Sequence, residues 1–470
     1  MSTEILKVEV VVIGAGPGGY VAGIRLGQLA KKVLVIEKAA PGGVCLNVGC
    51  IPSKALINAA KLYEKIGHAA DMGITADGLK VDIASLQRWK ETVVGKLTGG
   101  VRQLLKANGC AYRQGSATLL SARTIRLMVP GSEEEILVET EHVIIATGAR
   151  PVAIPSLPFD GNRVVDSTGA LAFAELPRRL VVVGAGYIGM EIGTLYAKLG
   201  SKVTFVEALP TMLAGSDPEC VQVVARKAKK LGMEVLLDAK AKGLVEKGDS
   251  ALLTVETKGG TVEIPADKVL VAVGRRPNIE DLGLEIAGVK TANGFITVDR
   301  QMRTSVPNIF AIGDVAGQPL LAHKASREAE VAAEVIADKP AAMDAATIPA
   351  VVFTDPEIAS AGITAEEAEK RGHKVKVGKF PFAALGRAIA NLDTDGFAKV
   401  VMDSDSGQVL GVHLVGAGVG DLISEAGLAI EMGATAADLG MTVHPHPTLS
   451  EAIMEAAKAA QGEAIHILNR

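Results

Sequence analysis

Val10-Val11-Val12-Ile13-Gly14-Ala15-Gly16-Pro17-Gly18-Gly19 returns later in the chain as Leu180-Val181-Val182-Val183-Gly184-Ala185-Gly186-Tyr187-Ile188-Gly189. In both copies an apolar strand leads into a Gly-x-Gly-x-x-Gly loop, and a helical stretch and a second strand follow. The second strands end in Glu37 and Glu207, each 23 residues after the first glycine of its loop. One such loop is often a mere strand turn. Strand, loop, helix, strand and acid at the same spacing twice predict two dinucleotide-binding units.

The residue types of these units suit a dinucleotide. The first glycine permits a sharp turn, the second leaves room for a pyrophosphate, and the third lets helix and strand pack closely. The phosphate then meets the amides of a helix N-terminus. Glu37 and Glu207 can accept hydrogen bonds from an adenosine ribose, although either alone could be a solvated carboxylate. Residues 208–215 contain no arginine for a 2′-phosphate, which favours NAD over NADP.

A pair of cysteines, Cys45 and Cys50, follows the first loop closely. The chain has 4 cysteines in 470 residues, and its start leaves no room for a secretory signal. These observations argue against a structural disulfide framework and favour a transient, redox-active disulfide. Cys110 and Cys220 stand alone, and we predict that they are packing residues.

Length and charge narrow the class of protein. A chain of 470 residues predicts about three domains. The 49 basic and 53 acidic residues give a net charge of −4 without a basic block, which argues against nucleic acid as a partner. A membrane span needs ~20 predominantly apolar residues, and the sequence contains no convincing stretch of that kind. We therefore expect a cytoplasmic enzyme.

The units and the remaining chain predict the domain organisation. Each unit closes with a strand and a glycine, Gly148 or Gly274, before the chain passes on. From about Thr347, hairpin signals such as the strands predicted over 397–402 and 409–415 indicate an antiparallel sheet with helices. We predict an α/β protein with two Rossmann-like domains and a C-terminal α+β domain, divided at 1–149, 150–276, 277–346 and 347–470.

Two further elements could carry chemistry. Asp314 follows a short apolar strand and Gly313, where a flavin's ribityl hydroxyls could use its carboxylate, although Gly-Asp alone is an ordinary turn. His446 lies between Pro445 and Pro447, which restrict the chain and can present an imidazole at a surface. Thr448 and Glu451 fit a capping box for the next helix, and spacing alone favours that structural role.

With these motifs in this order, the chain resembles the pyridine nucleotide-disulfide oxidoreductases over essentially its whole length. The specific pieces are the cysteine run, residues 43–56, and residues 446–451. The likeness is strongest to members that oxidise protein-bound dihydrolipoamide with NAD. The resemblance implies the cofactors FAD and NAD, and the lipoyl domains of 2-oxo acid dehydrogenase or glycine-cleavage complexes as partners.

The resemblance also assigns roles to residues. It implies that Cys45 exchanges with substrate, that Cys50 faces FAD, and that the chain forms a homodimer whose active sites are shared. His446, held by Glu451, would act as the base in the other subunit's site. No metal ligand is assigned. The implied FAD contacts are Gly14, Gly16, Gly19, Glu37, Lys54, Gly115, Ala146, Thr147, Gly148, Asp314, Leu320, Leu321, Ala322 and His323. The implied NAD contacts are Gly184, Gly186, Gly189, Glu207 and Gly274, with Tyr187 or Glu191 near the nicotinamide.

Two alternatives stay open on the sequence. A glutathione-reductase-like enzyme would carry a lysine pair after Cys-x-Pro and arginines for NADP, whereas this chain has Ser53 and no such arginines. A non-enzymatic scaffold subunit could keep the fold, but intact Cys45, Cys50 and His446 argue against it.

Overall fold

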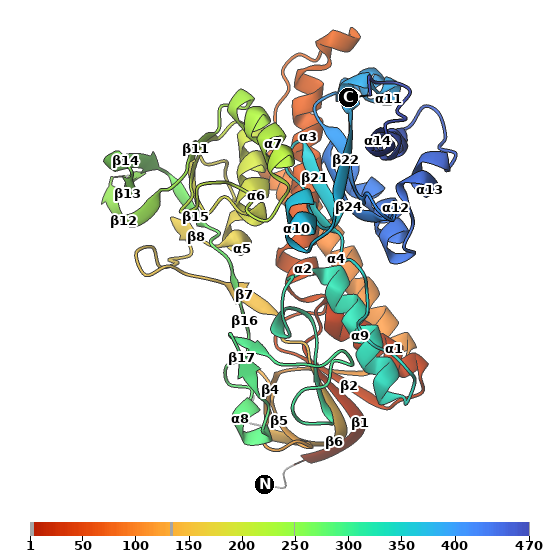
Figure 1. Cartoon of the computed structure of the whole chain (residues 1–470). Helices are drawn as coiled ribbons and strands as arrows, with labels where there is room; N and C mark the ends of the chain where they lie inside the picture. Colours follow the sequence, from red (N-terminus) through yellow and green to blue (C-terminus); the bar gives the residue numbers. More distant parts are fainter. Residues whose placement is uncertain (1–3, 132–134, 249, 470) are drawn as a thin grey trace.

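The structure is a computed structural model that describes residues 4–131, 135–248 and 250–469. The first sheet lies at one end of the molecule, and the second dinucleotide unit and the C-terminal sheet lie side by side at the other (Figure 1). Helix α3 (Cys50–Gly67) extends from the first unit to that far end, where it packs against α6 (Tyr187–Lys198). The predicted α/β class with two Rossmann-like units and a C-terminal α+β region is confirmed.

The first sheet is built around strand β1, whose residues 10–13 are buried on both faces, as in the middle of a parallel sheet. One face packs against α1 (Pro17–Gln28) and α9 (Ala322–Ile336), which also contact each other. The strand order is β3-β2-β1-β6-β5-β4, with β19 paired to β6. Its strands are β1 (Glu4–Ile13), β2 (Val33–Glu37), β3 (Ala111–Gln114), β4 (Ser116–Leu119), β5 (Thr124–Met128), β6 (Glu135–Ile145) and β19 (Ile309–Ala311).

The second sheet repeats this order as β11-β10-β9-β15, with β8 at the edge. The register repeats as well, because Ile13 pairs with Ile36 in the first sheet and Val183 pairs with Val206 in the second. A three-stranded antiparallel sheet of β12, β13 and β14 adjoins it. The elements are β8 (Val164–Val165), α5 (Ser167–Ala170), β9 (Arg179–Val183), β10 (Lys202–Val206), α7 (Pro218–Lys230), β11 (Glu234–Leu236), β12 (Lys240–Lys247), β13 (Ser250–Thr257), β14 (Gly260–Ala266) and β15 (Lys268–Val271).

The chain enters and leaves the second unit along two short strands that lie side by side. Strand β7 (Ala149–Pro151) leads in, β16 (Arg275–Pro277) leads out, and the two pair antiparallel. This pairing places the closing turns of both units next to each other. Smaller elements around the first unit are α2 (Gly43–Val48), η1 (Ala69–Met72), α4 (Ile83–Ala107), α8 (Leu284–Ala287), β17 (Thr291–Ala292), β18 (Phe295–Ile296) and η2 (Gly313–Val315).

The C-terminal sheet has the order β20-β21-β24-β23-β22 and is antiparallel throughout. The predicted hairpin is confirmed, since β23 and β24 pair with each other. Helices α12 and α14 contact the sheet. The elements are β20 (Ala350–Val352), β21 (Glu357–Gly362), α10 (Ala365–Lys370), β22 (Val375–Pro381), η3 (Phe382–Ala384), α11 (Gly386–Ala390), β23 (Phe397–Asp403), β24 (Val409–Gly416), α12 (Val419–Glu431), α13 (Ala436–Met441) and α14 (Glu451–Gln461).

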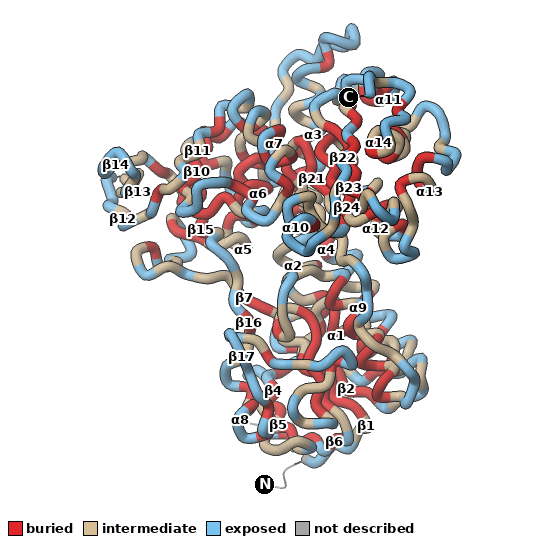
Figure 2. Tube along the Cα trace, in the orientation of Figure 1, coloured by how far each residue is buried: buried red, intermediate tan, exposed pale blue. Residues whose placement is uncertain are grey.

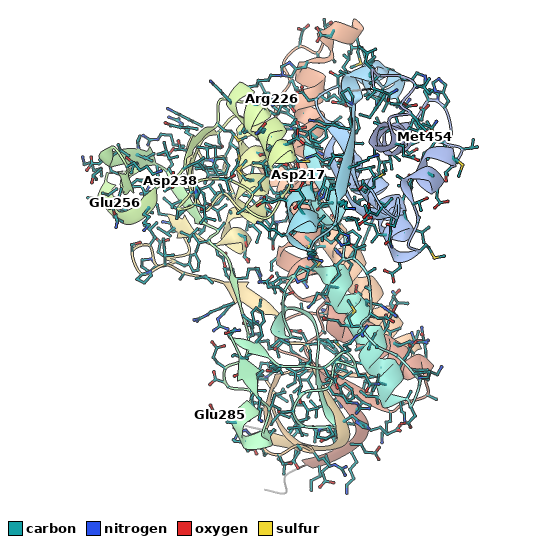
Figure 3. The ribbon with its side chains drawn as sticks, viewed as in Figure 1. Asp217, Arg226, Asp238, Glu256, Glu285 and Met454 are labelled. Atoms are coloured by element: carbon teal, nitrogen blue, oxygen red, sulfur yellow. The ribbon has the colours of Figure 1, made fainter. Side chains whose placement is uncertain are left out.

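Buried residues run through both units and the C-terminal sheet (Figure 2), and one buried apolar cluster joins α3, the second unit and the C-terminal sheet. Buried charge also joins the second unit to the C-terminal sheet. Asp217 lies at the start of α7 (Figure 3). It accepts a hydrogen bond of 2.8 Å from Lys399 of β23, and both side chains are buried. In the described part of the chain, no helix is long and apolar enough to cross a membrane.

Candidate active site

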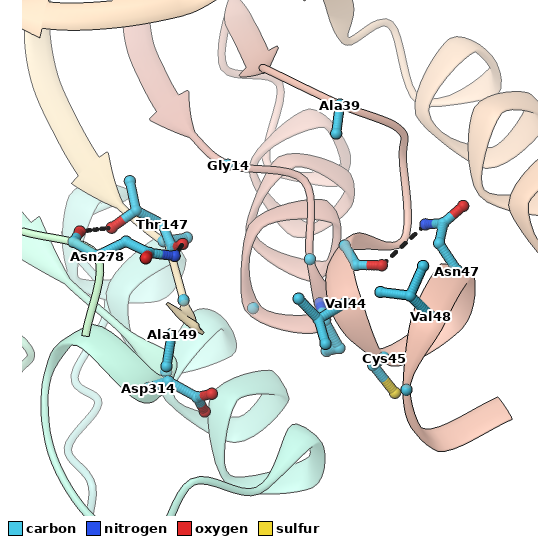
Figure 4. Close-up of a pocket in the computed structure, with 18 of the residues that line it drawn as sticks. Gly14, Ala39, Val44, Cys45, Asn47, Val48, Thr147, Ala149, Asn278 and Asp314 are labelled. Carbon is cyan, nitrogen blue, oxygen red and sulfur yellow. Dashed lines mark hydrogen bonds between the residues drawn. The ribbon is translucent and has the colours of Figure 1, made fainter. Parts of the chain in front are cut away.

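A pocket of about 580 Å³ opens where β1 and β6 end (Figure 4). Its lining joins segments that are far apart in the sequence: the first glycine loop, the cysteine run, the turn after β6 and Asp314. The carboxyl ends of parallel strands are where open α/β sheets bind their ligands. The volume lies within the usual range of cofactor pockets.

The first glycine loop is held against the end of β2 by Glu37. Gly14 has a φ of +103°, and a Cβ there would lie 2.3 Å from the carbonyl oxygen of Ala146. The amide of Ala15 donates a hydrogen bond of 2.7 Å to one oxygen of Glu37, and the amide of Ala39 donates one of 2.8 Å to the other. Glu37 thus both orders the loop and brings a carboxylate to the pocket.

Most residues that the sequence assigns to FAD line this one pocket. Gly19 instead serves packing, because a Cβ there would lie 1.9 Å from the carbonyl oxygen of Gly14. Leu321 precedes the first turn of α9, and the ring of His323 hydrogen-bonds the carbonyl oxygen of Pro349 at 2.7 Å, so the lining does not include these two. The assigned residues that line the pocket are Gly14, Gly16, Glu37, Lys54, Gly115, Ala146, Thr147, Gly148, Asp314, Leu320 and Ala322.

Cys45 and Cys50 line the pocket as an interacting pair of thiols. Cys45 lies in α2, and Cys50 is the first residue of α3, where the helix dipole favours a thiolate. A hydrogen bond from Cys45 and the positive charge of Lys54 lower the pKa of Cys50 to about 7. The same hydrogen bond and burial raise the pKa of Cys45. The pair is therefore built to hold one negative charge, on Cys50. The predictions that Cys110 and Cys220 are packing residues are confirmed, since both are buried.

An ion pair stands beside the cysteines. The Lys54 ammonium lies 2.7 Å from an oxygen of Glu191, a residue of α6 that is 3% exposed. Tyr187, at the start of the same helix, also lines the pocket; the residue is 42% exposed, but desolvation of the phenol in the pocket raises its pKa to about 12. The second unit thus reaches the pocket of the first through α6.

Arg275 and Asn278 are among the residues of this pocket that sequence reasoning missed. The hydroxyl of Thr147 donates to the carbonyl oxygen of Asn278 at 2.7 Å, and the Asn278 amide donates to the carbonyl oxygen of Thr147 at 2.8 Å (Figure 4). Arg275 donates to the carbonyl oxygen of Ala149. No local pattern indicated these two residues, because they reach the pocket through the pairing of β7 with β16.

The second glycine loop has the backbone of the first but a more open setting. Gly184 also has a φ of +103°, and a Cβ there would lie 2.5 Å from the carbonyl oxygen of Ala272. Glu207 accepts from the amides of Ala185 and Leu209 at 2.6 and 2.8 Å. A Cβ at Gly186 would meet no atom of the described residues within 4 Å. Gly274 closes the unit with similarly open space, while a Cβ on Gly189 would lie 2.1 Å from the carbonyl oxygen of Gly184.

His446 lies on the C-terminal region and is not among the residues that line the pocket of its own chain. Its Nδ1 donates to one oxygen of Glu451 at 2.9 Å, and the other oxygen accepts from the amide of Thr448 at 2.8 Å. The imidazole is 78% exposed. The capping box is only half present, because α14 begins at Glu451 with Ser450 as its N-cap, and the Thr448 hydroxyl donates to Pro445 instead. Glu451 therefore orients the imidazole and supports the loop at once.

Two family profiles match consecutive parts of this chain. The sequence profile described as "Pyridine nucleotide-disulphide oxidoreductase" matches residues 8–329, and the profile of that family's dimerisation domain matches residues 348–457. The chain belongs to the pyridine nucleotide-disulphide oxidoreductases. The family that the sequence motifs predicted is confirmed, and the C-terminal sheet is its dimerisation domain.

Individual relatives of this oxidoreductase are similar over their whole length. A dihydrolipoyl dehydrogenase of Geobacillus stearothermophilus is 51% identical, covering 99% of this chain and 98% of the relative. A dihydrolipoyl dehydrogenase of Halobacterium salinarum is 48% identical, with 98% of both chains covered. The crystal structure of LpdA from Mycobacterium tuberculosis superposes with a TM-score of 0.90 at 28% identity, covering 96% of this chain and 99% of that one.

FAD and NAD are the cofactors of this oxidoreductase, and the pocket fits the first of them. At Gly14 a side chain would collide with the turn after β6, and at Gly43 a Cβ would lie 2.5 Å from the Cα of Gly16. The shape of the pocket around the first glycine loop therefore requires glycine at these positions. Glu37 and Asp314 offer carboxylates to hydroxyl groups, and burial raises the pKa of Asp314. Across the described residues, no three His, Cys, Asp or Glu side chains gather into a group that could hold a metal ion.

Proposed function

We propose that this oxidoreductase oxidises protein-bound dihydrolipoamide to lipoamide and reduces NAD⁺ to NADH. The observation that carries the proposal is the Cys45–Cys50 pair, placed in one pocket with the first glycine loop and with the start of α6. A dithiol substrate needs a disulfide partner, and the low pKa of Cys50 makes it a good leaving group. The identity to dihydrolipoyl dehydrogenases supports the same substrate.

The two cysteines divide the exchange between them. In the oxidised enzyme, a substrate thiolate attacks the Cys45 sulfur, a mixed disulfide forms, and Cys50 leaves as a thiolate. The second substrate thiol, deprotonated, attacks the substrate sulfur of that mixed disulfide and expels Cys45, which releases lipoamide. Lys54 and the N-terminus of α3 stabilise the negative charge that remains on Cys50.

FAD, when bound, carries the electron pair from the thiols to NAD⁺. We assign its ribose to Glu37, its pyrophosphate to the loop at Gly14 and Gly16, and its ribityl chain to Asp314. We assign NAD to Gly184, Gly186, Gly189, Gly274 and Glu207, with Tyr187 and Glu191 beside the nicotinamide. The carboxylate of Glu207 and the absence of arginine from residues 208–215 favour NAD over NADP.

We infer that the base comes from the other subunit of a homodimer. His446 is exposed, is oriented by Glu451 and lies outside its own chain's pocket, while the C-terminal region matches a dimerisation domain. A positioned base is needed because a thiol with a pKa of ~8.5 is only a few per cent ionised at neutral pH. The imidazole would take the proton of a substrate thiol, and the Glu451 carboxylate would stabilise the imidazolium.

We further propose the setting in which this chemistry runs. Its partners are the lipoyl domains of 2-oxo acid dehydrogenase or glycine-cleavage complexes, and its compartment is the cytoplasm. The proposed division assigns FAD to residues 1–149 and 277–346, NAD to residues 150–276, and dimer contacts to residues 347–470. The pairing of β7 with β16 supports the inner boundaries of this division.

The experiment that tests this function is steady-state turnover of the purified, FAD-loaded protein. Dihydrolipoamide and glutathione are compared as dithiol and monothiol substrates, each with NAD and with NADP. We expect turnover with dihydrolipoamide and NAD to exceed every other combination by orders of magnitude. Preferred reduction of oxidised glutathione by NADPH, measured on the same preparation, would make it a glutathione-reductase-like enzyme, and a protein that cannot take up FAD would be a scaffold.

A further inference from the structure

The segment from the end of β20 to the first residue of β21, residues 353–357, contacts helices α3 and α6. Phe353 contacts Lys54 and Glu191, Asp355 pairs with Lys198, and Glu357 pairs with Lys61 at 2.5 Å. Three alternate residues of one short segment therefore hold helices α3 and α6 together.

The spacing along the helices matches this arrangement. Lys54 and Lys61 are seven residues apart in α3, and Glu191 and Lys198 are seven residues apart in α6. Because two helical turns are about seven residues, each pair lies on one face of its helix. The segment thus meets both helices along the line where they face each other, and α3 begins at Cys50.

Phe353 stands at the end of this segment that is closest to the cysteines. The Lys54 ammonium lies 4.5 Å from the centre of its ring, within the range of a cation–π interaction. Its backbone amide donates a hydrogen bond of 2.9 Å to one oxygen of Glu191, whose other oxygen pairs with Lys54. A single residue therefore holds both members of the ion pair. No sequence motif indicated it, since a phenylalanine next to a strand is normally a packing residue.

Building on the proposed function, we propose that Phe353 is a positioning residue that fixes the Lys54 ammonium beside the Cys50 thiolate. Cys50 and Lys54 are four residues apart in α3 and share a helix face. The ring of Phe353 restricts Lys54 directly, and its amide holds the Glu191 carboxylate that pairs with Lys54. The C-terminal sheet, which is the family's dimerisation domain, thereby influences the charge at the redox pair.

The sign of the effect follows from the groups around the thiol. Those that face Cys50 are Cys45 from α2, Lys54 from its own helix, and Glu191 and Tyr187 from α6. Lys54 lowers the pKa of Cys50, and Glu191 raises it. Without the aromatic ring, Lys54 is less confined, while the amide of residue 353 still holds Glu191. Removing the ring should therefore raise the pKa of Cys50.

The test measures the thiol itself. In the FAD-loaded protein carrying Cys45→Ser, the rate of Cys50 alkylation by iodoacetamide is followed against pH, with the label located by peptide mass spectrometry. Phe353→Leu should move the midpoint upward by about half a pH unit, about threefold less reaction below the midpoint. Phe353→Tyr keeps an aromatic face and should keep the midpoint. Phe353→Met, of similar size but without a ring, should repeat the shift if the leucine variant does not fold.

A matched control comes from a second lysine and ring. Lys379 lies 4.1 Å from the ring centre of Phe397, a buried residue of β23 outside the pocket lining. Phe397→Leu removes a comparable contact and should leave the midpoint unchanged. An unchanged midpoint in both ringless variants at position 353, or an equal shift in Phe397→Leu, would overturn the proposal. Failure of the wild type to oxidise dihydrolipoamide would instead refute the proposed function, because the alkylation readout does not require turnover.

Discussion

The two glycine-loop units share one backbone but differ in what surrounds it. Both first glycines have a φ of +103°, and both acids accept hydrogen bonds from two backbone amides. Strand order and register repeat as well. The common part therefore explains why each unit can hold a dinucleotide.

The two units differ in how closely other residues approach the second glycine of the loop. In the first unit α2 closes over the loop, so that Gly43 approaches Gly16, and Glu37 is 8% exposed. In the second unit, the space at Gly186 is open to at least 4 Å among the described residues, and Glu207 is half-buried. An enclosed site slows ligand release, whereas an open one permits exchange. With the proposed assignment of cofactors, we therefore expect the first unit to retain its cofactor and the second unit to exchange its cofactor.

The largest expected effect comes from the first glycine of each loop. Gly14→Ala and Gly184→Ala each force a Cβ onto a carbonyl oxygen at a positive φ, which should cost about 3 kcal/mol of stability. We expect Gly14→Ala to abolish FAD retention, and Gly184→Ala to keep FAD but lose NAD. Thermal unfolding and flavin content measure both. Gly73→Ala, at a φ of +76° with open space among the described residues, is the matched control and should cost about 1 kcal/mol.

A smaller effect should separate the two acids. Glu37→Gln and Glu207→Gln each replace an acceptor oxygen with an amide that faces a backbone N–H. The loss should be about 2 kcal/mol at buried Glu37 and about 1 kcal/mol at Glu207, measured by chemical unfolding. Equal losses would contradict the difference in burial. Glu263→Gln, at an exposed position of β14 in the second unit, should have no measurable effect.

The cysteines extend the comparison to pH. The pKa of Cys50 is lowered to about 7, so its thiolate is present above this pH and is lost as the pH falls through it. The stability that this ionisation contributes is complete above the unfolded thiol's pKa of ~8.5 and disappears in the same direction. Alkylation of the reduced protein should therefore fall about tenfold per pH unit below 7, or about 1.4 kcal/mol.

One buried cysteine in each unit serves as the internal control for that experiment. Burial raises the pKa of Cys110 to about 11 and also raises the pKa of Cys220. Neither should be labelled in the folded protein at pH 8. Labelling of Cys220 but not of Cys110 would mean that the second unit unfolds locally more often than the first, although both cysteines are buried.

The smallest effect concerns a residue outside both units. Glu451→Gln removes the charge that orients His446 and should lower dithiol turnover about fivefold, which corresponds to about 1 kcal/mol. FAD and NAD retention should not change, because no contact with either cofactor is assigned to Glu451. Lower thermal stability with intact turnover would leave Glu451 only its structural role.

The sequence predicted those parts of the site that depend on local pattern. Two glycine loops with Glu37 and Glu207 at a fixed spacing indicate two strands, a helix and their register together. The hairpin of β23 and β24 follows from alternation and a turn. The cysteine pair was visible because cysteines are rare in this chain.

The parts that depend on distant packing could not be predicted. Arg275 and Asn278 enter the pocket only because β7 and β16 pair. Phe353 reaches Lys54 from a segment about 300 residues away, and neither residue carries a signal of the other. The capping box at Thr448 is only half present for a related reason, since α14 begins at Glu451 and the Thr448 hydroxyl donates to the carbonyl oxygen of Pro445. Such contacts are set by tertiary structure, which local spacing does not encode.

Cofactor dissociation from one preparation tests the central comparison most directly. The purified protein is saturated with FAD and NAD and dialysed, and the remaining amount of each is measured per chain over time. We predict that FAD stays stoichiometric until the protein is unfolded, while NAD leaves as fast as the dialysis allows. Loss of both at the same rate, or retention of NAD after FAD has left, would contradict the account.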